Sequence, residues 1–329
     1  MKSQLLAGAA LLTAALICGP AIGQVTNYPT KPVRMVIPYP PGGAVDTLAR
    51  ATGNELSKAW GQPVVIESKP GAAGVTAAAA VGQSAADGYT LFFSDLVPFT
   101  ITPFLQRDLP YDPIKDFAAV IALVSSSSML VVAKSFPANT VGEFITAAKA
   151  KPGSINFGSW GIASTAHLDT EELSAAAGIS MTHVPYKGAA DMFRGLLAGD
   201  VQAAFISLGA ASPQIKQGLV RPLAYGAAKR ALLMPEIPTM AESGLPGLGN
   251  FAVGSCLGLF VPAATPRAII NKIAADAARV SSAQAFRERF VEGVGFEVYG
   301  LPPDQFTKLL DDSRVKYEVL LKRLKLEIN

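Results

Sequence analysis

The hydrophobic and polar positions of the amino-terminal third alternate between two periods. Three short apolar runs are typical of buried strands: "VRMVIP" (33–38), "PVVIE" (63–67) and "YTLFFS" (89–94). Apolar residues at helical spacing between Val45 and Leu56 predict one helix, which Gly61 closes, and the alanine-rich stretch 71–84 predicts another. Strands that alternate with helices in this way predict a parallel sheet with helices on its faces.

The middle of the chain repeats this scheme. Four further strands are expected: "INFG" (155–158), "MTHVPY" (181–186), "VQAAFI" (201–206) and "RPLAYG" (221–226). Thr140 and Glu143 form a capping box before one helix, and another helix is expected from Thr165 to Ala177. Towards the carboxyl end, "GLFVPA" (258–263) predicts a strand, Thr265 and Pro266 the cap and first residue of a helix, and apolar residues between 306 and 324 a last helix.

Two apolar segments interrupted by small residues are expected to cross between two lobes. They are "ALVSSSSMLVV" (122–132) and "NFAVGSCLGLFV" (250–261). The predicted fold is therefore α/β, with a discontinuous first lobe (24–127 and 251–329) and an inserted second lobe (128–250). Each lobe is expected to be a mostly parallel sheet flanked by helices, and the two crossover strands to act as a hinge about which a cleft opens and closes.

The first residues have the pattern of a secretory signal. Lys2 precedes an uncharged apolar run from Leu5 to Ile17, and Ala21-Ile22-Gly23 provides small residues before a cut at Gln24. Cleavage of residues 1–23 leaves 306 residues (329 minus 23). A membrane anchor is disfavoured because the run is shorter than the ~20 residues that span a bilayer. A lipid-modified Cys18 is a minor alternative, since bulky residues precede it. We expect a periplasmic location.

Composition excludes several classes of function. A formal net charge of +3, with scattered charges, does not suggest nucleic-acid binding. Cys256 is the only cysteine beyond the signal, so no internal disulfide is expected. With two histidines in the chain, we expect no metal site. No cofactor is expected either, because the "PPGG" turn matches neither GxGxxG nor a phosphate-binding loop.

Candidate chemistry lies in loops that follow strands and lead into helices. Ligands of open parallel sheets bind beyond the carboxyl ends of the strands. After the first strand come Tyr39, Gly42, Gly43 and Asp46; after the 155–158 strand comes "GSWGIASTAH" (158–167), with Ser164 as an N-cap; after the 181–186 strand, "YKGAAD" opens a helix at Gly188. Helix amino-termini carry unpaired N–H groups and a partial positive charge, so these loops predict a site for an anion.

Each of these residues also has an ordinary structural interpretation. "PPGG" alone is usually a turn, Ser164 a plain cap, and His167 a loop or packing residue. Asp46 could complement the dipole of its own helix or select a ligand amine or hydroxyl. His183 lies in a strand pattern and is expected to be structural, as is the serine run 125–128, interpreted as a strand junction.

At the same loops the sequence resembles the tripartite tricarboxylate transporter receptors, also called Bug-type extracytoplasmic solute-binding proteins. The resemblance extends from about Tyr28 to beyond Pro266. It is carried by eight segments in the order of the family: "YPTKPVRMVIPYPPGGAVDTLAR", "GQPVVIESKPGAAG", "ADGYTLFFSD", "LPYDPIKDF", "KPGSINFGSWGIASTAHL", "HVPYKGAA", "IPTMAESGLPG" and "GLFVPAATP".

The resemblance implies a two-lobed, type II-like periplasmic binding protein that clamps a small carboxylated solute, an organic acid or a zwitterion. The candidate contacts in the first lobe are Tyr39, Gly42, Gly43 and Asp46, with Ser94 and Asp95 bordering the cleft. Those in the second lobe are Ser159, Gly161, Ser164, Thr165, His167, Tyr186 and Lys187. The expected partners are permease subunits of a tripartite transporter or a sensor protein, and the receptor itself is expected to be a monomer.

Four positions depart from the family pattern and concern the distal end of the solute. Cys256 replaces a frequent aromatic residue, no acidic residue stands near Ile206, Asp191 replaces proline, and Gly195 replaces aspartate. The rival function is a periplasmic hydrolase that uses Ser164 with His167. No acidic orienting residue can be named for it, and no GxSxG motif is present. We therefore expect a receptor rather than an enzyme.

Overall fold

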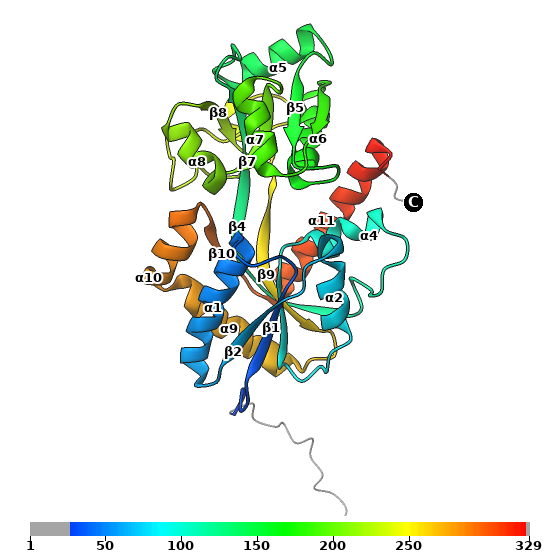
Figure 1. Cartoon of the computed structure of the whole chain (residues 1–329), viewed down its shortest axis with the longest axis vertical. Helices are drawn as coiled ribbons and strands as arrows, with labels where there is room; N and C mark the ends of the chain where they lie inside the picture. The colour runs from blue at the N-terminus through cyan, green and yellow to red at the C-terminus, as the bar shows by residue number, and fades with distance from the viewer. Residues whose placement is uncertain (1–26, 327–329) are drawn as a thin grey trace, which may run out of the picture.

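The computed structural model of the protein describes residues 27–326. Two lobes are joined by two long strands, β4 (Phe117–Ala133) and β9 (Gly254–Pro262), as Figure 1 shows. The predicted signal segment, the cut before Gln24 and the alternative at Cys18 lie outside the described residues. Within residues 27–326, no helix has both the length and the apolar character that crossing a membrane requires.

The first lobe is built from both ends of the chain. Its elements before the first crossover are β1 (Val33–Ile37), α1 (Ala44–Trp60), β2 (Val64–Ser68), η1 (Ala72–Gly74), α2 (Val75–Gly82), β3 (Thr90–Ser94), α3 (Val97–Thr100) and α4 (Thr102–Leu105). Those after the second crossover are α9 (Arg267–Ser282), α10 (Gln284–Phe286), the π-helical η3 (Arg287–Val291), η4 (Glu292–Val294), β10 (Glu297–Leu301) and α11 (Pro303–Leu324).

The second lobe lies between the crossovers. Its elements are α5 (Val141–Ala150), β5 (Asn156–Ser159), α6 (Thr165–Ala177), β6 (Thr182–Pro185), α7 (Ala189–Ala198), β7 (Ala203–Ser207), α8 (Leu208–Lys216), β8 (Val220–Tyr225) and η2 (Ala241–Ser243). The capping box of α5 is present in part. Thr140 Oγ1 accepts the N–H of Glu143 at 3.1 Å, and the Glu143 carboxylate accepts the N–H of Asn139 at 2.6 Å rather than that of Thr140.

Both sheets are mixed, which corrects the expectation of mostly parallel sheets. β1 pairs in parallel with β2 and β3, and β5 pairs in parallel with β6 and β7, as the strand–helix alternation predicts. The antiparallel ladders all involve the crossover strands: β3 with β9, and β4 with β9, β10, β7 and β8. β4 and β9 run antiparallel because the chain leaves the first lobe along β4 and returns to it along β9.

Strand β4 exchanges its partners inside the serine run. Residues from Phe117 to Ser127 pair with β9, and those from Ser128 onward pair with β7. The side chains of Ser125 to Ser127 are half-buried, whereas the apolar residues on either side of the run are buried. The run is therefore the junction between the two lobes, as the sequence predicts.

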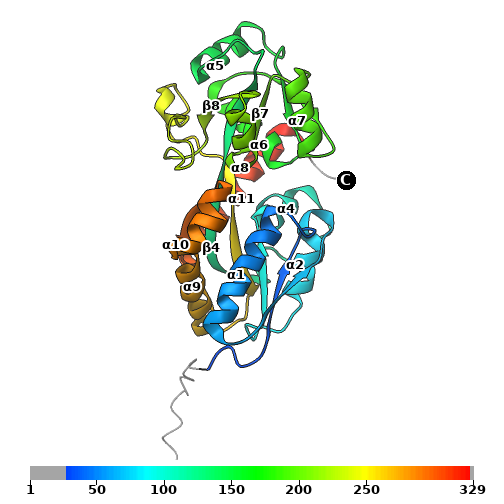
Figure 2. The same ribbon diagram turned by 60° about the vertical axis from the view of Figure 1, so that its left-hand side comes forward.

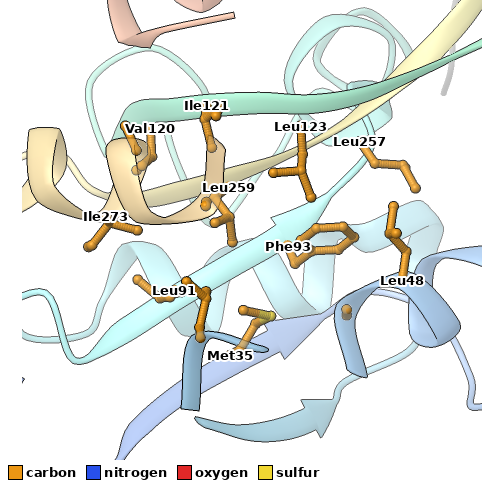
Figure 3. Packing of buried hydrophobic residues seen from close by; sticks show 14 of the residues in the cluster. Met35, Leu48, Leu91, Phe93, Val120, Ile121, Leu123, Leu257, Leu259 and Ile273 are labelled. Atoms are coloured by element: carbon orange, nitrogen blue, oxygen red, sulfur yellow. The ribbon is translucent and has the colours of Figure 1, made fainter. Parts of the chain in front are cut away.

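Each lobe has apolar layers on both faces of its sheet. In the first lobe, Leu91 and Phe93 pack with Met35, Leu48 and the α9 helix on one face, as Figure 3 shows. Phe92 points to the other face, where its ring lies among those of Phe99, Phe117 and Phe260. Burial on both faces explains why these strands are continuous apolar runs without alternation.

The last helix, α11, makes a third connection between the lobes. Figures 1 and 2 show it beside the crossover strands, with its carboxyl end close to the second lobe. Tyr317, Leu320 and Leu321 pack with Ile101 of the first lobe and Leu168 of α6. Lys316 Nζ lies 2.6 Å from a carboxylate oxygen of Glu172, also on α6. The carboxyl-terminal half of α11 thus contacts both lobes.

A buried carboxyl group, Asp169 of α6, lies where these connections meet. Its side chain is 1% exposed, and its Oδ2 has no hydrogen-bond partner among the described residues. Burial raises the pKa of Asp169 to about 7, an effect that Ser128 and Lys316 partly oppose. The junction therefore contains an acid that takes up a proton far more readily than an exposed aspartate.

Candidate functional site

The loop between β1 and α1 exposes its backbone. Gly42 has a φ of +95°, and Gly43 is the N-cap of α1, with φ −81° and no side chain that caps the first turn. A Cβ added at either glycine would meet nothing within 4 Å. The first N–H groups of α1 have no intrahelical acceptor, so this loop offers donors that an outside oxygen can approach.

The side chains of this loop are engaged in holding its shape. Asp46 accepts the Gly42 N–H through Oδ2 at 2.9 Å, and its Oδ1 lies 2.8 Å from Arg50 Nε. The Arg50 guanidinium, with the Gly42 N–H, holds the pKa of Asp46 below its ordinary value. Asp46 is 5% exposed, and its carboxylate stabilises the turn in this structure.

A tyrosine links the same loop to the end of β3. Tyr39 donates its hydroxyl to Asp95 Oδ2 at 2.6 Å, and Ser68 donates to the Tyr39 carbonyl at 2.6 Å. Burial raises the pKa of Tyr39, and Asp95 reinforces the effect, so the phenol remains a neutral donor. Ser94 is fully buried beside Asp95, and its Oγ finds no hydrogen-bond partner among the described residues.

The loop between β5 and α6 is shaped by short hydrogen bonds. Ser159 Oγ accepts the Gly161 N–H at 3.1 Å and lies 2.9 Å from the Gly161 carbonyl. Ser164 is the N-cap of α6, accepts the backbone N–H of His167 at 3.4 Å and donates to the Gly161 carbonyl at 2.7 Å. Thr165, the first residue of the helix, is half-buried.

Two histidines lie behind this loop. Their rings stack with centroids 3.8 Å apart and planes at 6°, and Phe157 stacks on His183 at 4.9 Å. Burial, together with His183, lowers the pKa of His167 to about 4, and burial lowers that of His183. Both rings are therefore neutral near pH 7. Within residues 27–326, no group of three or more His, Cys, Asp or Glu could hold a metal ion.

The loop between β6 and α7 contributes a half-buried tyrosine and an exposed lysine. The N–H of Tyr186 donates to the Ser159 carbonyl at 2.9 Å, which joins this loop to the preceding one. The Tyr186 ring lies along α7, where a Cβ on Gly195 would overlap its hydroxyl. The glycine at 195, a departure from the family pattern, thus makes room for Tyr186. Lys187 is exposed, and Gly188 begins α7 without a side-chain cap.

Two cavities flank the crossover strands. The larger, of 390 Å³, is bounded by Thr165, by Ser125 and Ser127 of β4, by Cys256 of β9 and by Tyr317 of α11. Burial raises the pKa of Cys256, so its thiol stays protonated and unreactive in this wall.

The smaller cavity, of 260 Å³, brings together the starts of α1 and α8. It is bounded by Ala44 and Thr47 on one side, by Ser207 and Gly209 on the other, and by Ser126 of β4. Ser126, Ser207 and Gly209 are not among the residues that the sequence pattern indicates for the site. No glycine loop precedes α8. The only sequence feature that could have indicated a site at the start of α8 was the end of an apolar strand at Ser207.

The predicted site residues thus form two groups, one on each lobe. Tyr39, Gly42, Gly43 and Asp46 share the loop at the start of α1, and Ser94 lies at the end of β3. Ser159, Gly161, Ser164, Thr165, His167, Tyr186 and Lys187 share two adjacent loops of the second lobe. Within residues 27–326, no hydrogen bond joins the β1–α1 loop to those two loops.

Two mixed α/β lobes, two crossover strands and uncapped helix starts around the junction together define the two-lobed class of extracytoplasmic solute-binding proteins. Residues 48–326 match the family described as "Tripartite tricarboxylate transporter family receptor". The chain belongs to this family.

Individual relatives agree with this assignment. The "UPF0065 protein in gbd 5'region" of Cupriavidus necator is 34% identical over 320 residues, which is 97% of this chain and 95% of the relative. The structure described as "R. palustris Rpa4515 with adipate" has a TM-score of 0.75 and 31% identity, and covers 90% of this chain and 97% of its own. "MatC (Rpa3494) from Rhodopseudomonas palustris with bound malate" has a TM-score of 0.71 and 29% identity, and covers 89% and 100%.

Proposed function

We propose that the protein captures a small carboxylate-bearing solute between its lobes in the periplasm and presents it to the permease of a tripartite transporter. The observation that carries the proposal is the pair of open backbone loops at the starts of α1 and α6, one on each lobe. Solute that contacts both loops would favour a closed arrangement of the lobes, because it gains interactions there that neither lobe offers alone.

The available interactions are strong enough for this role. A helix amino-terminus stabilises a nearby anion by ~0.3–1 kcal/mol. A hydrogen bond to a charged group adds ~1.5–3 kcal/mol. Three or four such bonds, after the cost of ordering, reach the ~8 kcal/mol of micromolar binding without an arginine in the site. Donors of this kind can be replaced by water, which permits the release that transport requires.

The proposed lobe boundaries are 24–127 with 251–329, and 128–250. The exchange of β4 partners at Ser128 supports the first boundary, and the last β9 pair, at Gly254, lies close to the second. The contacts of α11 with α6 add a carboxyl-terminal segment that reaches across the boundary. A monomer released by cleavage before Gln24 is the proposed mature form.

A thermal-shift screen of the mature chain tests the function. Adipate and malate come first because they are bound in two related structures, followed by citrate, benzoate and zwitterionic amino acids. A solute at 100 times its Kd should stabilise the native state by about 2.7 kcal/mol. The absence of any shift across carboxylates, or a shift produced only by uncharged compounds, would contradict the proposal.

A sensor-coupled receptor is the second candidate, because the same lobe closure could be detected by a signalling protein. Binding measurements do not separate it from transport; pull-down of the solute-loaded form against permease and sensor components does. The hydrolase alternative finds no support in the geometry. His167 Nδ1 accepts the Ala163 N–H and Ser164 Oγ donates to the Gly161 carbonyl, so neither atom is directed at the other.

A further inference from the structure

The segment 159–165 has an unusual backbone that its own residues do not explain. Gly161 has a φ of +137° and Ala163 a φ of +59°. A left-handed conformation is unfavourable for alanine because its Cβ approaches the following carbonyl oxygen. Ala163 is also half-buried, so solvent alone does not hold it there. Some interaction from outside the segment must therefore favour this shape.

The two buried histidines supply that interaction. Nδ1 of His167 accepts the N–H of Ala163 at 3.0 Å, and Nε2 of His183 lies 2.7 Å from Ser159 Oγ, which in turn holds the Gly161 N–H. His167 is 5% exposed, its ring stacks on that of His183, and its Nε2 lies 4.0 Å from Glu171 Oε1 on the same helix. The two rings thus reach the loop from behind, one at each end.

This arrangement sorts the amides of the segment into two sets. The N–H groups of Gly161, Ala163 and Ser164 are directed inward, to Ser159 Oγ, His167 Nδ1 and the Gly161 carbonyl. Those of Ile162 and Thr165 have no acceptor within residues 27–326. Ile162 is 65% exposed, and Thr165 borders the 390 Å³ cavity. Free N–H groups at the start of a helix are donors of the kind that bind anions.

We propose that His167 and His183 are positioning residues of the solute site, whose rings hold segment 159–165 so that the free N–H groups of Ile162 and Thr165 face the solute carboxylate. The inference rests on the proposed function and refines it. His167, first considered as a contact of the solute, acts through the loop instead. The role requires neutral imidazoles, because a protonated His167 could no longer accept the Ala163 N–H.

Nuclear magnetic resonance of the histidine rings tests the geometry without any solute. The chain has two histidines, so its imidazole nitrogens are readily assigned. At pH 7, we expect Nδ1 of His167 to be unprotonated and its Nε2 to carry the proton, with the Ala163 amide shielded from hydrogen exchange. A proton on Nδ1, or an Ala163 amide that exchanges as fast as an exposed one, would overturn the proposal.

Matched variants test the consequence for binding, with adipate and malate as probes in calorimetry. His167→Leu removes the acceptor and should raise Kd at least about tenfold, the equivalent of one lost hydrogen bond of ~1.4 kcal/mol. His167→Asn, whose Oδ1 can occupy the place of Nδ1, should recover most of that loss. At the other ring, His183→Gln should retain affinity better than His183→Phe, which preserves only the stacking.

Thr140→Ala is the control, because it removes a hydrogen bond of similar kind from the cap of α5, elsewhere in the same lobe. It should lower thermal stability by a similar amount and leave Kd unchanged. Equal Kd values for wild type, His167→Leu and His167→Asn would refute the positioning role while leaving the receptor function intact. Failure of the wild type to bind any carboxylate would instead refute the proposed function, and this inference with it.

Discussion

Gly43 provides a direct test of backbone access at the start of α1. A valine there would place three carbon atoms over the first turn of the helix, where Gly43 is the N-cap and the following amides are free. The protein itself should accept the change. The φ of −81° and ψ of 174° lie in the extended region that suits valine, and an added Cβ meets nothing within 4 Å.

The expected size of the effect follows from these contacts. Loss of one hydrogen bond to a charged carboxylate costs ~1.5–3 kcal/mol, which is about a 10- to 150-fold rise in Kd, and loss of two costs more. The effect on folding should stay within about 1 kcal/mol. Valine is a poorer N-cap than glycine, but it also reduces the freedom of the unfolded chain.

Calorimetric titration of the mature protein with the strongest solute of the carboxylate panel measures the change, and chemical denaturation measures stability. Gly249→Val is a suitable control, since Gly249 is exposed in the other lobe and an added Cβ there also meets nothing. Gly42→Val is less informative because its φ of +95° strains any side chain. Unchanged affinity of Gly43→Val would refute the assignment of this loop to the site.

Three further outcomes are expected. Saturating solute should reduce the radius of gyration in solution scattering, and an identical radius in both states would argue against lobe closure. Gly209→Val should loosen the seat of α8 on the first lobe and lower the melting temperature, because its Cβ overlaps the Val294 carbonyl; an unaltered melting temperature would show that the contact is not rigid. Between pH 4 and 6.5, His167, whose pKa falls from 6.5 to about 4 on folding, contributes stability that increases with pH. Asp169, whose pKa is raised to about 7, contributes stability that decreases with pH over the same range, so the two contributions largely cancel and Asp169→Asn should uncover the rise. A profile unchanged by that substitution would contradict the raised pKa of Asp169, and a flat profile of the variant would contradict the lowered pKa of His167.

The sequence predicted the ends of a helix well where it contained both an N-cap residue and a residue that terminates the helix. Helix α6 runs from Thr165 to Ala177 as expected, because Ser164 caps it and Gly178 adopts the left-handed conformation that ends it. Helix α9 begins one residue late, with Pro266 as its cap instead of its first residue. Strand ends within the lobes shifted by a residue or two, whereas β4 begins five residues before the expected 122 and β9 four residues before the expected 258. Pairing partners rather than composition decide where a strand begins and ends.

The candidate site was predicted as loops but not as side-chain contacts, and its role in binding stays a prediction. Glycines before helices indicated the segments around Gly43 and Gly161, because that pattern has a local physical cause. The bond from Tyr39 to Asp95 depends on how segments distant in sequence come together. The bond from Asp46 to Gly42 and the packing of Tyr186 on Gly195 are local in sequence, but they depend on the backbone path of the turns that precede α1 and α7, which the sequence pattern does not specify.

The third connection between the lobes restricts how they can move. Two extended strands can twist along their length, but a helix has a fixed rise of about 1.5 Å per residue and does not stretch. Tyr317 and Leu321 of α11 pack against Leu168 of α6. The helix therefore keeps the separation of the two lobes constant on its side of the junction. The lobes should therefore rotate about an axis close to α11. The side of the junction opposite α11 should show the largest displacement between the open and closed states.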